Sequence, residues 1–180
     1  IYFQMTYFDE IKRTMEILAK EEKVIFVGQS IAYTGTSMYG TVEHVPKEKK
    51  IELPVFEDVQ MGISTGLALE GYIPISIYPR MDFLVLAFNQ LITHLDKIEQ
   101  MSDGQFKPKV IIRTAIGSVK PLFPGPQHCQ DYTEQLKIML KNINVVKLEK
   151  STDILFQYTK ALESEKSTIL IEIPDKYQDE

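Results

Sequence analysis

The stretch Leu53-Pro-Val-Phe-Glu-Asp-Val-Gln-Met-Gly62 carries most of the information about the fold. Its apolar first half predicts a strand over residues 51–56, followed at once by a helix over residues 59–70. The helix contains small residues that allow close packing, although glycine costs about 1 kcal/mol relative to alanine in a helix: Gly62, Ser64, Gly66 and Ala68. Glu57 stands at the junction, and the end of a strand is the edge of a sheet where open α/β folds bind ligands.

The segments on either side alternate between helical and strand patterns. Apolar residues at steps of three and four predict further helices over residues 6–20, 82–100, 132–140 and 152–163. Short apolar runs predict further strands over residues 24–27, 73–78, 109–113, 145–148 and 168–173. Strands that alternate with helices form mainly parallel sheets covered on both faces. We therefore predict an α/β fold, a single three-layer domain with a mostly parallel central sheet of about five or six strands flanked by helices.

Composition limits the class of protein. The chain has 180 residues, 44% of them hydrophobic, which suffices for one core and a single domain. A net charge of −5 without a basic, aromatic stretch argues against nucleic-acid binding. The only cysteine, Cys129, excludes an intrachain disulfide framework, and no apolar run reaches the about 20 residues of a membrane span, so we predict a cytoplasmic protein. Residues 1–4 are typical of a cleaved tag, so the domain is assigned to residues 5–180.

Two irregular segments interrupt the alternation, residues 28–50 and residues 115–130. Irregular segments of this length are usually functional or mobile. The second contains His128 among proline and glycine residues after a predicted strand, at the sheet edge predicted for Glu57. A histidine there can exchange protons near neutral pH, but it can equally be a loop residue bonded to backbone. The residues alone leave both interpretations open.

The remaining sequence patterns do not favour a nucleotide, phosphate, metal or nucleophilic site. No glycine-rich dinucleotide or phosphate-binding motif is present, and the spacing of histidines and cysteine predicts no metal site. His44 and His94 are predicted to be surface or packing residues. A nucleophilic pair of His128 and Cys129 is disfavoured because adjacent side chains in an extended segment point in opposite directions. Glu57 also has a structural interpretation, as an acid that complements the dipole of the following helix.

Several short motifs occur in a characteristic order: Pro54-Val-Phe-Glu57, Ala68-Leu-Glu-Gly71, Tyr72-Ile-Pro74, Met81-Asp-Phe83, Ala87-Phe-Asn-Gln90, Met101-Ser-Asp-Gly-Gln105, Val110-Ile-Ile-Arg-Thr114 and Gln127-His128. Their order and spacing resemble the pyrimidine-binding domain of thiamine-diphosphate enzymes. The version that they resemble occurs in the beta subunit of the decarboxylating component of 2-oxo-acid dehydrogenases and in transketolases. The similarity runs from about residue 6 to residue 173.

The resemblance implies a role for each candidate residue. Glu57 matches the glutamate that hydrogen-bonds a ring nitrogen of the cofactor's aminopyrimidine and favours its imino tautomer. Phe83 matches the aromatic residue that stacks on the pyrimidine, with Tyr78 and Met81 as further cofactor-binding residues, although a core role for Phe83 is also open. His128 matches the histidine that faces the substrate. Glu57 and His128 are therefore the expected catalytic residues.

The chain departs from the family pattern in three places. Gly28-Gln29-Ser30 stands where the dehydrogenases usually have Gly-Glu-Asp or Gly-Glu-Glu, so the resemblance implies an altered substrate preference. The dehydrogenase beta subunits continue into a further domain that this sequence lacks, which argues against membership of a dehydrogenase complex. The Gly-Asp-Gly motif for diphosphate and Mg²⁺ is also missing, since Asp103-Gly104 predicts a turn. An alpha-type partner subunit is expected to hold both, and the chain is expected to be inactive alone.

The resulting hypothesis is a pyrimidine-binding subunit of a two-subunit thiamine-diphosphate enzyme. Its small-molecule substrate would be a 2-oxo acid or a ketose, and the reaction a decarboxylation or a two-carbon or acyl transfer. The small-residue helix and the helix after Phe83 are suited to subunit contacts, so a homodimer or a heterotetramer is expected. Two alternatives are a non-catalytic binding or regulatory module with the transketolase-like fold and a flavodoxin-like domain unrelated to thiamine.

Overall fold

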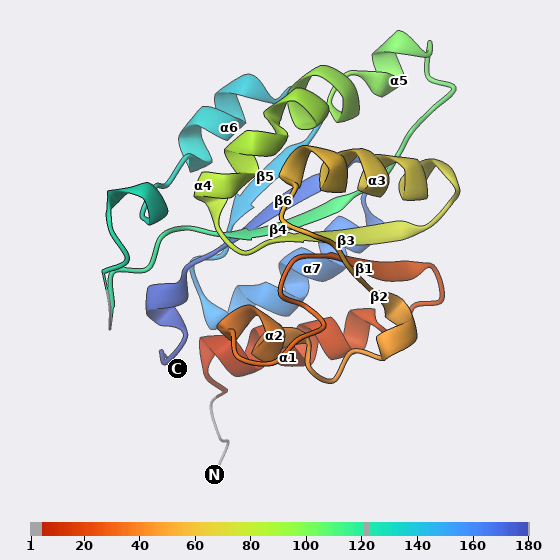
Figure 1. Cartoon of the computed structure of the whole chain (residues 1–180). Coiled ribbons are helices and arrows are strands. Elements are labelled where there is room, and N and C mark those ends of the chain that lie inside the picture. The colour runs from red at the N-terminus through yellow and green to blue at the C-terminus, as the bar shows by residue number, and fades with distance from the viewer. Residues whose placement is uncertain (1–4, 121–122, 180) are drawn as a thin grey trace.

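The computed structural model describes residues 5–120 and 123–179. The predicted tag remnant, residues 1–4, lies outside the described residues. Six parallel strands form one sheet in the order β2-β1-β3-β4-β6-β5 (Figure 1). The strands are β1 Val24–Gly28, β2 Lys50–Glu52, β3 Ile73–Tyr78, β4 Ile111–Ala115, β5 Asn144–Lys147 and β6 Thr168–Glu172. Helices cover both faces, which confirms the predicted three-layer α/β fold.

Two hydrophobic clusters separate the helices into layers. The first lies under α1 Tyr7–Leu18, α2 Ser37–Val42 and α7 Ile154–Glu163. The second lies under α3 Glu57–Leu69, α4 Met81–Leu84 and α6 Thr133–Met139. Because strand side chains alternate between faces, Ile75 and Ile77 of β3 join the first cluster, whereas Tyr78 joins the second. Ser76 points to the same face as Tyr78, since its hydroxyl lies 2.9 Å from the hydroxyl of Ser64 in α3.

The strand order creates a switch point beside β1. The chain leaves β1 for the edge strand β2 and then returns to pair β3 on the other side of β1. The two connections lie on opposite faces, because α2 belongs to the layer of α1 and α3 to the layer of α4. In doubly wound sheets, ligands bind at the carboxyl ends of strands next to such a point. The start of α3 therefore lies where a ligand site is expected.

The quoted stretch differs in detail from its prediction. β2 ends at Glu52, and the next four residues are irregular before α3 begins at Glu57. β2 is an edge strand paired only with β1, and Pro54 has no N–H to continue the pairing. Val55 and Phe56 are consequently exposed rather than buried in a strand.

The helix predicted over residues 82–100 is broken into pieces. It consists of α4, a 3₁₀ turn Val85–Ala87, a π-helical segment Asn89–Leu95 and α5 Ile98–Met101. The irregular segment 28–50 contains α2 and a 3₁₀ turn Lys47–Lys49, and three further 3₁₀ turns cover Pro126–His128, Ser151–Asp153 and Pro174–Lys176. Over the described residues, no helix has the length and apolar character of a membrane span.

Candidate active site

Glu57 is the first residue of α3 and is 4% exposed. Its Oε1 is buried and has no hydrogen-bond partner among the described residues. An acid that only complements a helix dipole gains about 0.3–1 kcal/mol at an exposed position. A buried polar atom without a partner costs about 1–3 kcal/mol, and more when it is charged. The dipole alone therefore does not account for this burial, and Oε1 remains free to accept a hydrogen bond from a ligand.

Tyr78 connects Glu57 to the end of the sheet. It is the last residue of β3, and its hydroxyl donates a hydrogen bond of 3.4 Å to the backbone oxygen of Glu57. Burial raises the pKa of Tyr78, and the negative charges of Glu57 and Asp58 raise it further. The hydroxyl therefore stays protonated and remains a donor at neutral pH.

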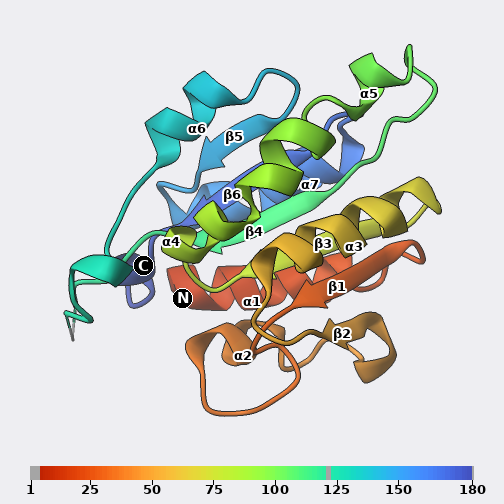
Figure 2. The same ribbon diagram turned by 45° about the horizontal axis from the view of Figure 1, so that its top comes forward.

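His128 lies in the 3₁₀ turn after β4, at the same end of the sheet as α4 (Figures 1 and 2). Its ring packs edge-on against Phe83 of α4, with ring centroids 5.3 Å apart and planes at 75°. Its Nδ1 is buried without a hydrogen-bond partner among the described residues. Phe83 is half-buried and belongs to neither buried core cluster. The two predicted residues thus meet, and each keeps part of its surface free of core packing.

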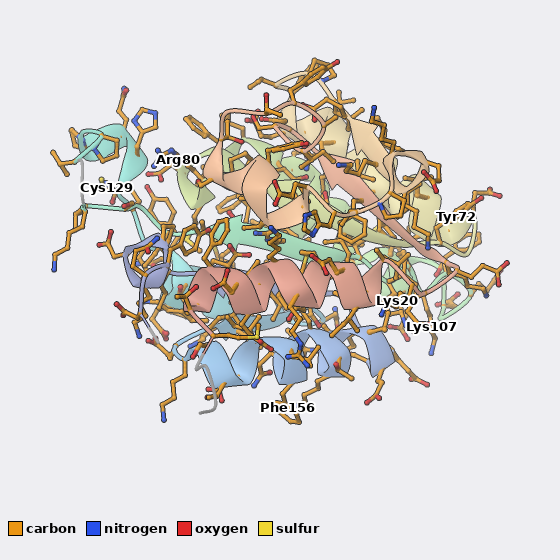
Figure 3. The ribbon with its side chains drawn as sticks, turned by 90° about the horizontal axis from the view of Figure 1, so that it is seen from below. Lys20, Tyr72, Arg80, Lys107, Cys129 and Phe156 are labelled. Atoms are coloured by element: carbon orange, nitrogen blue, oxygen red, sulfur yellow. The ribbon has the colours of Figure 1, made fainter. Side chains whose placement is uncertain are left out.

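Figure 3 shows which labelled residues lie at each end of the molecule. Arg80, which follows β3, and Cys129, which lies beyond β4, are at one end of the molecule. Tyr72 and Lys107, which precede the same two strands, are at the opposite end. Because β2, β3 and β4 are parallel, Glu57 also follows a carboxyl end, so it shares the edge of His128.

Met81 is a core residue at the start of α4, and Cys129 contacts the backbone of Ser118. Met81 is 1% exposed, belongs to the core under α4, and its sulfur accepts the N–H of Tyr132 at 2.9 Å. The thiol of Cys129 lies 3.5 Å from the backbone oxygen of Ser118. No hydrogen bond joins it to the ring of His128 among the described residues. The prediction from alternating side chains assumed an extended segment, whereas His128 lies in a 3₁₀ turn that ends at Cys129.

His44 and His94 are exposed, as predicted. Nδ1 of His44 lies 2.7 Å from a carboxylate oxygen of Glu16 at the surface. Among the described residues, no three acidic, histidine or cysteine side chains are grouped so that they could hold a metal ion.

Sequence reasoning missed the role of Glu52. Its carboxylate accepts backbone N–H groups of Ser30, Ile31 and Ala32 at 2.7, 2.8 and 2.9 Å. Ser30 has the unusual φ of 59° that this loop requires. A glutamate from β2 therefore orders the loop after β1. This is the loop in which Gln29 and Ser30 stand where the dehydrogenases usually have acidic residues. The only signal in the sequence was an acid at the end of an edge strand.

Gln29, at the departure from the family pattern, is 6% exposed. Its amide Nε2 lies 3.4 Å from Oε1 of Gln60, which is in α3 one turn after Glu57. Beside it is an open hollow of about 450 Å³, a volume within the range of small-molecule sites. The hollow is lined by Gln29, Ser30, Tyr33, Glu52, Leu53, Pro54 and Val55.

Asp58 and Asp82 add two further acids to this edge. Oδ1 of Asp58 and Oδ2 of Asp82 are buried, and like Glu57 Oε1 they have no hydrogen-bond partner among the described residues. Acceptors without a donor favour a ligand that carries N–H groups.

Comparison with known proteins places this edge in context. The chain is 28% identical over 134 residues to the pyruvate dehydrogenase E1 component subunit beta of Rickettsia conorii, covering 72% of the chain and 40% of that protein. It is 26% identical over 149 residues to the 3-methyl-2-oxobutanoate dehydrogenase subunit beta of Mycobacterium tuberculosis, covering 79% of the chain and 41% of that protein. The chain thus spans about two fifths of the length of these relatives.

Structural comparison agrees on the fold. The solved structure of a split-gene transketolase, described as an inactive beta4 tetramer, superposes with a TM-score of 0.69 at 19% identity. The match covers 93% of the chain and 50% of that structure's chain. No family model matches the sequence. The sequence relatives and the shared fold together confirm the resemblance to the transketolase-like pyrimidine-binding domain, in the form related to the beta subunits of 2-oxo-acid dehydrogenases.

Proposed function

We propose that the chain is the pyrimidine-binding half of a thiamine-diphosphate-dependent enzyme that acts on a 2-oxo acid or a ketose. The observation that carries the proposal is the buried Oε1 of Glu57 at the switch point of the sheet, which has no partner within residues 5–120 and 123–179. The three residues that the resemblance assigns to cofactor and substrate, Glu57, Phe83 and His128, belong to one sheet edge. The reaction is a decarboxylation or a transfer of a two-carbon or acyl group.

The residues fit the proposed cofactor. Its aminopyrimidine presents an exocyclic amine, and a ring nitrogen that can share a proton with a carboxyl group. At this edge, Oε1 of Glu57 and Oδ1 of Asp58 have no hydrogen-bond partner among the described residues. Phe83 offers an aromatic ring that is not part of the core. When bound, thiamine diphosphate supplies a carbon nucleophile that protein side chains do not provide.

Each of the chain's own residues at this edge has a separate role. Glu57 holds a proton at a pyrimidine ring nitrogen through Oε1, and Phe83 orients the ring. Tyr78, bonded to the Glu57 backbone, maintains the start of α3. Nδ1 of His128 has no partner in the part of the chain that the structure describes, which suits proton exchange with a substrate near neutral pH.

The diphosphate and Mg²⁺ are assigned to an alpha-type partner, because the relatives that the chain matches are named as beta subunits, which implies a second type of subunit. The solved split-gene transketolase, described as an inactive beta4 tetramer, gives a precedent for an inactive assembly of one type of transketolase chain. An apolar surface is available for assembly beside the site, formed by exposed Val55, Phe56, Val59, Ile63, Val85 and Leu86. Burying it between subunits favours a homodimer, or a heterotetramer with the partner.

The proposal is tested on the chain reconstituted with its partner, thiamine diphosphate and Mg²⁺. We expect Glu57→Gln to slow deuterium exchange at the thiazolium carbon by about 10² to 10⁴, because a positioned proton-transfer group is lost. Glu70→Gln, at the other end of α3, is the matched control and should exchange at the wild-type rate. His128→Ala should also exchange normally but turn over substrate slowly. Equal exchange in wild type and Glu57→Gln would refute the proposal and favour the non-catalytic module.

A further inference from the structure

Arg80, which precedes α4, and the first two residues of α4 hold the backbone of the loop that carries His128. Nη1 of Arg80 donates a hydrogen bond to the backbone oxygen of His128 at 3.2 Å. Oδ1 of Asp82 accepts the backbone N–H of Gln130 at 3.1 Å. Between them, the sulfur of Met81 accepts the N–H of Tyr132. Three consecutive side chains thus engage every second residue of the loop.

Gly117 approaches the same loop from the end of β4. A Cβ atom at this position would lie 1.9 Å from Cα of Cys129 and 2.5 Å from the backbone oxygen of His128. Atoms in contact do not approach so closely, and the obstacle is backbone rather than a flexible side chain. Any residue larger than glycine must therefore displace the loop at His128.

The residue that follows these contacts also meets the histidine ring. Phe83 follows Asp82 directly, and its ring meets the ring of His128 at 5.3 Å. The segment that fixes the loop backbone therefore also presents the aromatic surface against which the imidazole packs. Oδ2 of Asp82 is buried and has no partner among the residues that the structure describes.

We propose that Arg80, Asp82 and Gly117 form a histidine clamp, a set of positioning residues that place the ring of His128 against Phe83. The placement stands on the contacts above, whereas its effect on catalysis rests on the proposed function of His128. Opposite charges serve the two hydrogen bonds: the guanidinium donates to an oxygen, and the carboxylate accepts from an N–H. Bonds of this kind to charged groups are stronger than neutral ones.

The placement is tested by NMR on the full chain without cofactor or partner. The C–H signals of His128 are assigned by their loss in His128→Gln, which is practical because the chain has three histidines. The change of these chemical shifts in Phe83→Leu measures how far the neighbouring aromatic ring displaces the signals of His128. We expect Asp82→Ala and Arg80→Ala to lose that shift, as Phe83→Leu does, while Asp82→Asn keeps it because its amide oxygen still accepts the N–H of Gln130.

Gly117→Ala should lose the shift as well, and Gly66→Ala, whose added Cβ meets nothing within 4 Å, should keep it. If Gly117→Ala does not fold, the two side-chain variants still decide the question. Wild-type His128 signals in folded Asp82→Ala and Arg80→Ala would overturn the clamp. Loss of the shift in Asp82→Asn together with Asp82→Ala would also overturn it, since the oxygen acceptor would then not be what matters.

The catalytic consequence is read separately in the reconstituted enzyme. A displacement of about 1 Å from the reacting geometry costs about 10² in rate. Asp82→Ala should therefore lower kcat by about 10² with normal deuterium exchange at the thiazolium carbon, and Asp82→Asn should restore kcat. An inactive wild-type complex would refute the proposed function and leave the NMR result standing. An active complex with unchanged kcat in Asp82→Ala would refute the catalytic role of the clamp.

Discussion

Two buried groups of ionisable side chains differ in how completely they are paired. Arg113 of β4 and Glu172 of β6 are both fully buried and form an ion pair under α1, α2 and α7. Nη2 of Arg113 also donates to Thr41 at 2.8 Å, and the hydroxyl of Tyr177 donates to Glu172 at 2.9 Å. The carboxylate is therefore fully engaged by protein donors.

The candidate active site, on the α3 side of the sheet, is the opposite case. Glu57 Oε1 and His128 Nδ1 are buried but have no partner among the described residues. Burial alone thus does not distinguish a structural charge from a functional one. The difference lies in the carboxylates: both oxygens of Glu172 accept hydrogen bonds from protein donors, whereas Oε1 of Glu57 accepts none from the described residues. Nη1 of Arg113 is also buried without a partner among these residues, so the contrast applies to the acids and not to every atom of the two sites.

The largest effect should follow from breaking the paired site. Glu172→Gln removes the negative charge that neutralises Arg113 and should lower the free energy of unfolding by about 3–5 kcal/mol, as for one member of a buried pair. Urea denaturation of the chain measures this change. Arg13→Ala, which breaks an exposed pair with Glu10, is the control and should change stability by less than about 1 kcal/mol. A small effect of Glu172→Gln would show that the pair contributes little.

A milder change tests the ring of donors around Glu172. Tyr177→Phe keeps the aromatic ring but removes the hydroxyl that donates to the carboxylate. We expect a loss of about 1.5–3 kcal/mol, the contribution of a hydrogen bond to a charged group. Tyr72→Phe, at an exposed position, should be neutral when measured in the same denaturation series.

The paired site should also make stability depend on alkaline pH. Burial and the negative charge of Glu172 raise the pKa of the hydroxyls of Tyr7, Tyr158 and Tyr177. Above the unfolded pKa of about 10, the unfolded chain releases protons that the folded chain retains. Stability is therefore fully present below pH 10 and falls as the pH rises toward the folded pKa values.

Each such tyrosine contributes a slope of about 1.4 kcal/mol per pH unit. Urea denaturation between pH 9 and about 11 measures the slope. Tyr177→Phe should reduce this slope by the contribution of one tyrosine. An unchanged slope would contradict a raised pKa for Tyr177.

The smallest effect on stability is expected at the unpaired site. Glu57→Gln makes the same chemical change as Glu172→Gln, but no hydrogen bond to Oε1 is lost. The free energy of unfolding of the chain alone should therefore stay within about 0.5 kcal/mol of wild type or rise. A loss as large as that of Glu172→Gln would show that Glu57 is a structural charge and would remove the contrast.

The sequence predicted the elements that local periodicity encodes. All six strands lie within a few residues of their predicted positions, since alternation of apolar runs depends only on near neighbours. A parallel sheet then predicts that Glu57 and His128 lie at one edge, and the resemblance predicts their roles. The helix predicted over residues 82–100 was wrong in its continuity, because an apolar stripe does not show where hydrogen bonding shifts to the 3₁₀ and π patterns.

Which distant residues contact each other is determined only by the tertiary structure. Arg113 and Glu172 are 59 residues apart and meet because β6 pairs with β4, an order that no local pattern contains. Glu52 reaches the loop of Ser30 in the same way, through the pairing of β2 with β1. The contacts of Arg80 and Asp82 with the His128 loop depend on the adjacency of β3 and β4. Side-chain periodicity specifies which face of an element is buried, whereas the neighbour on that face is set by strand order and packing.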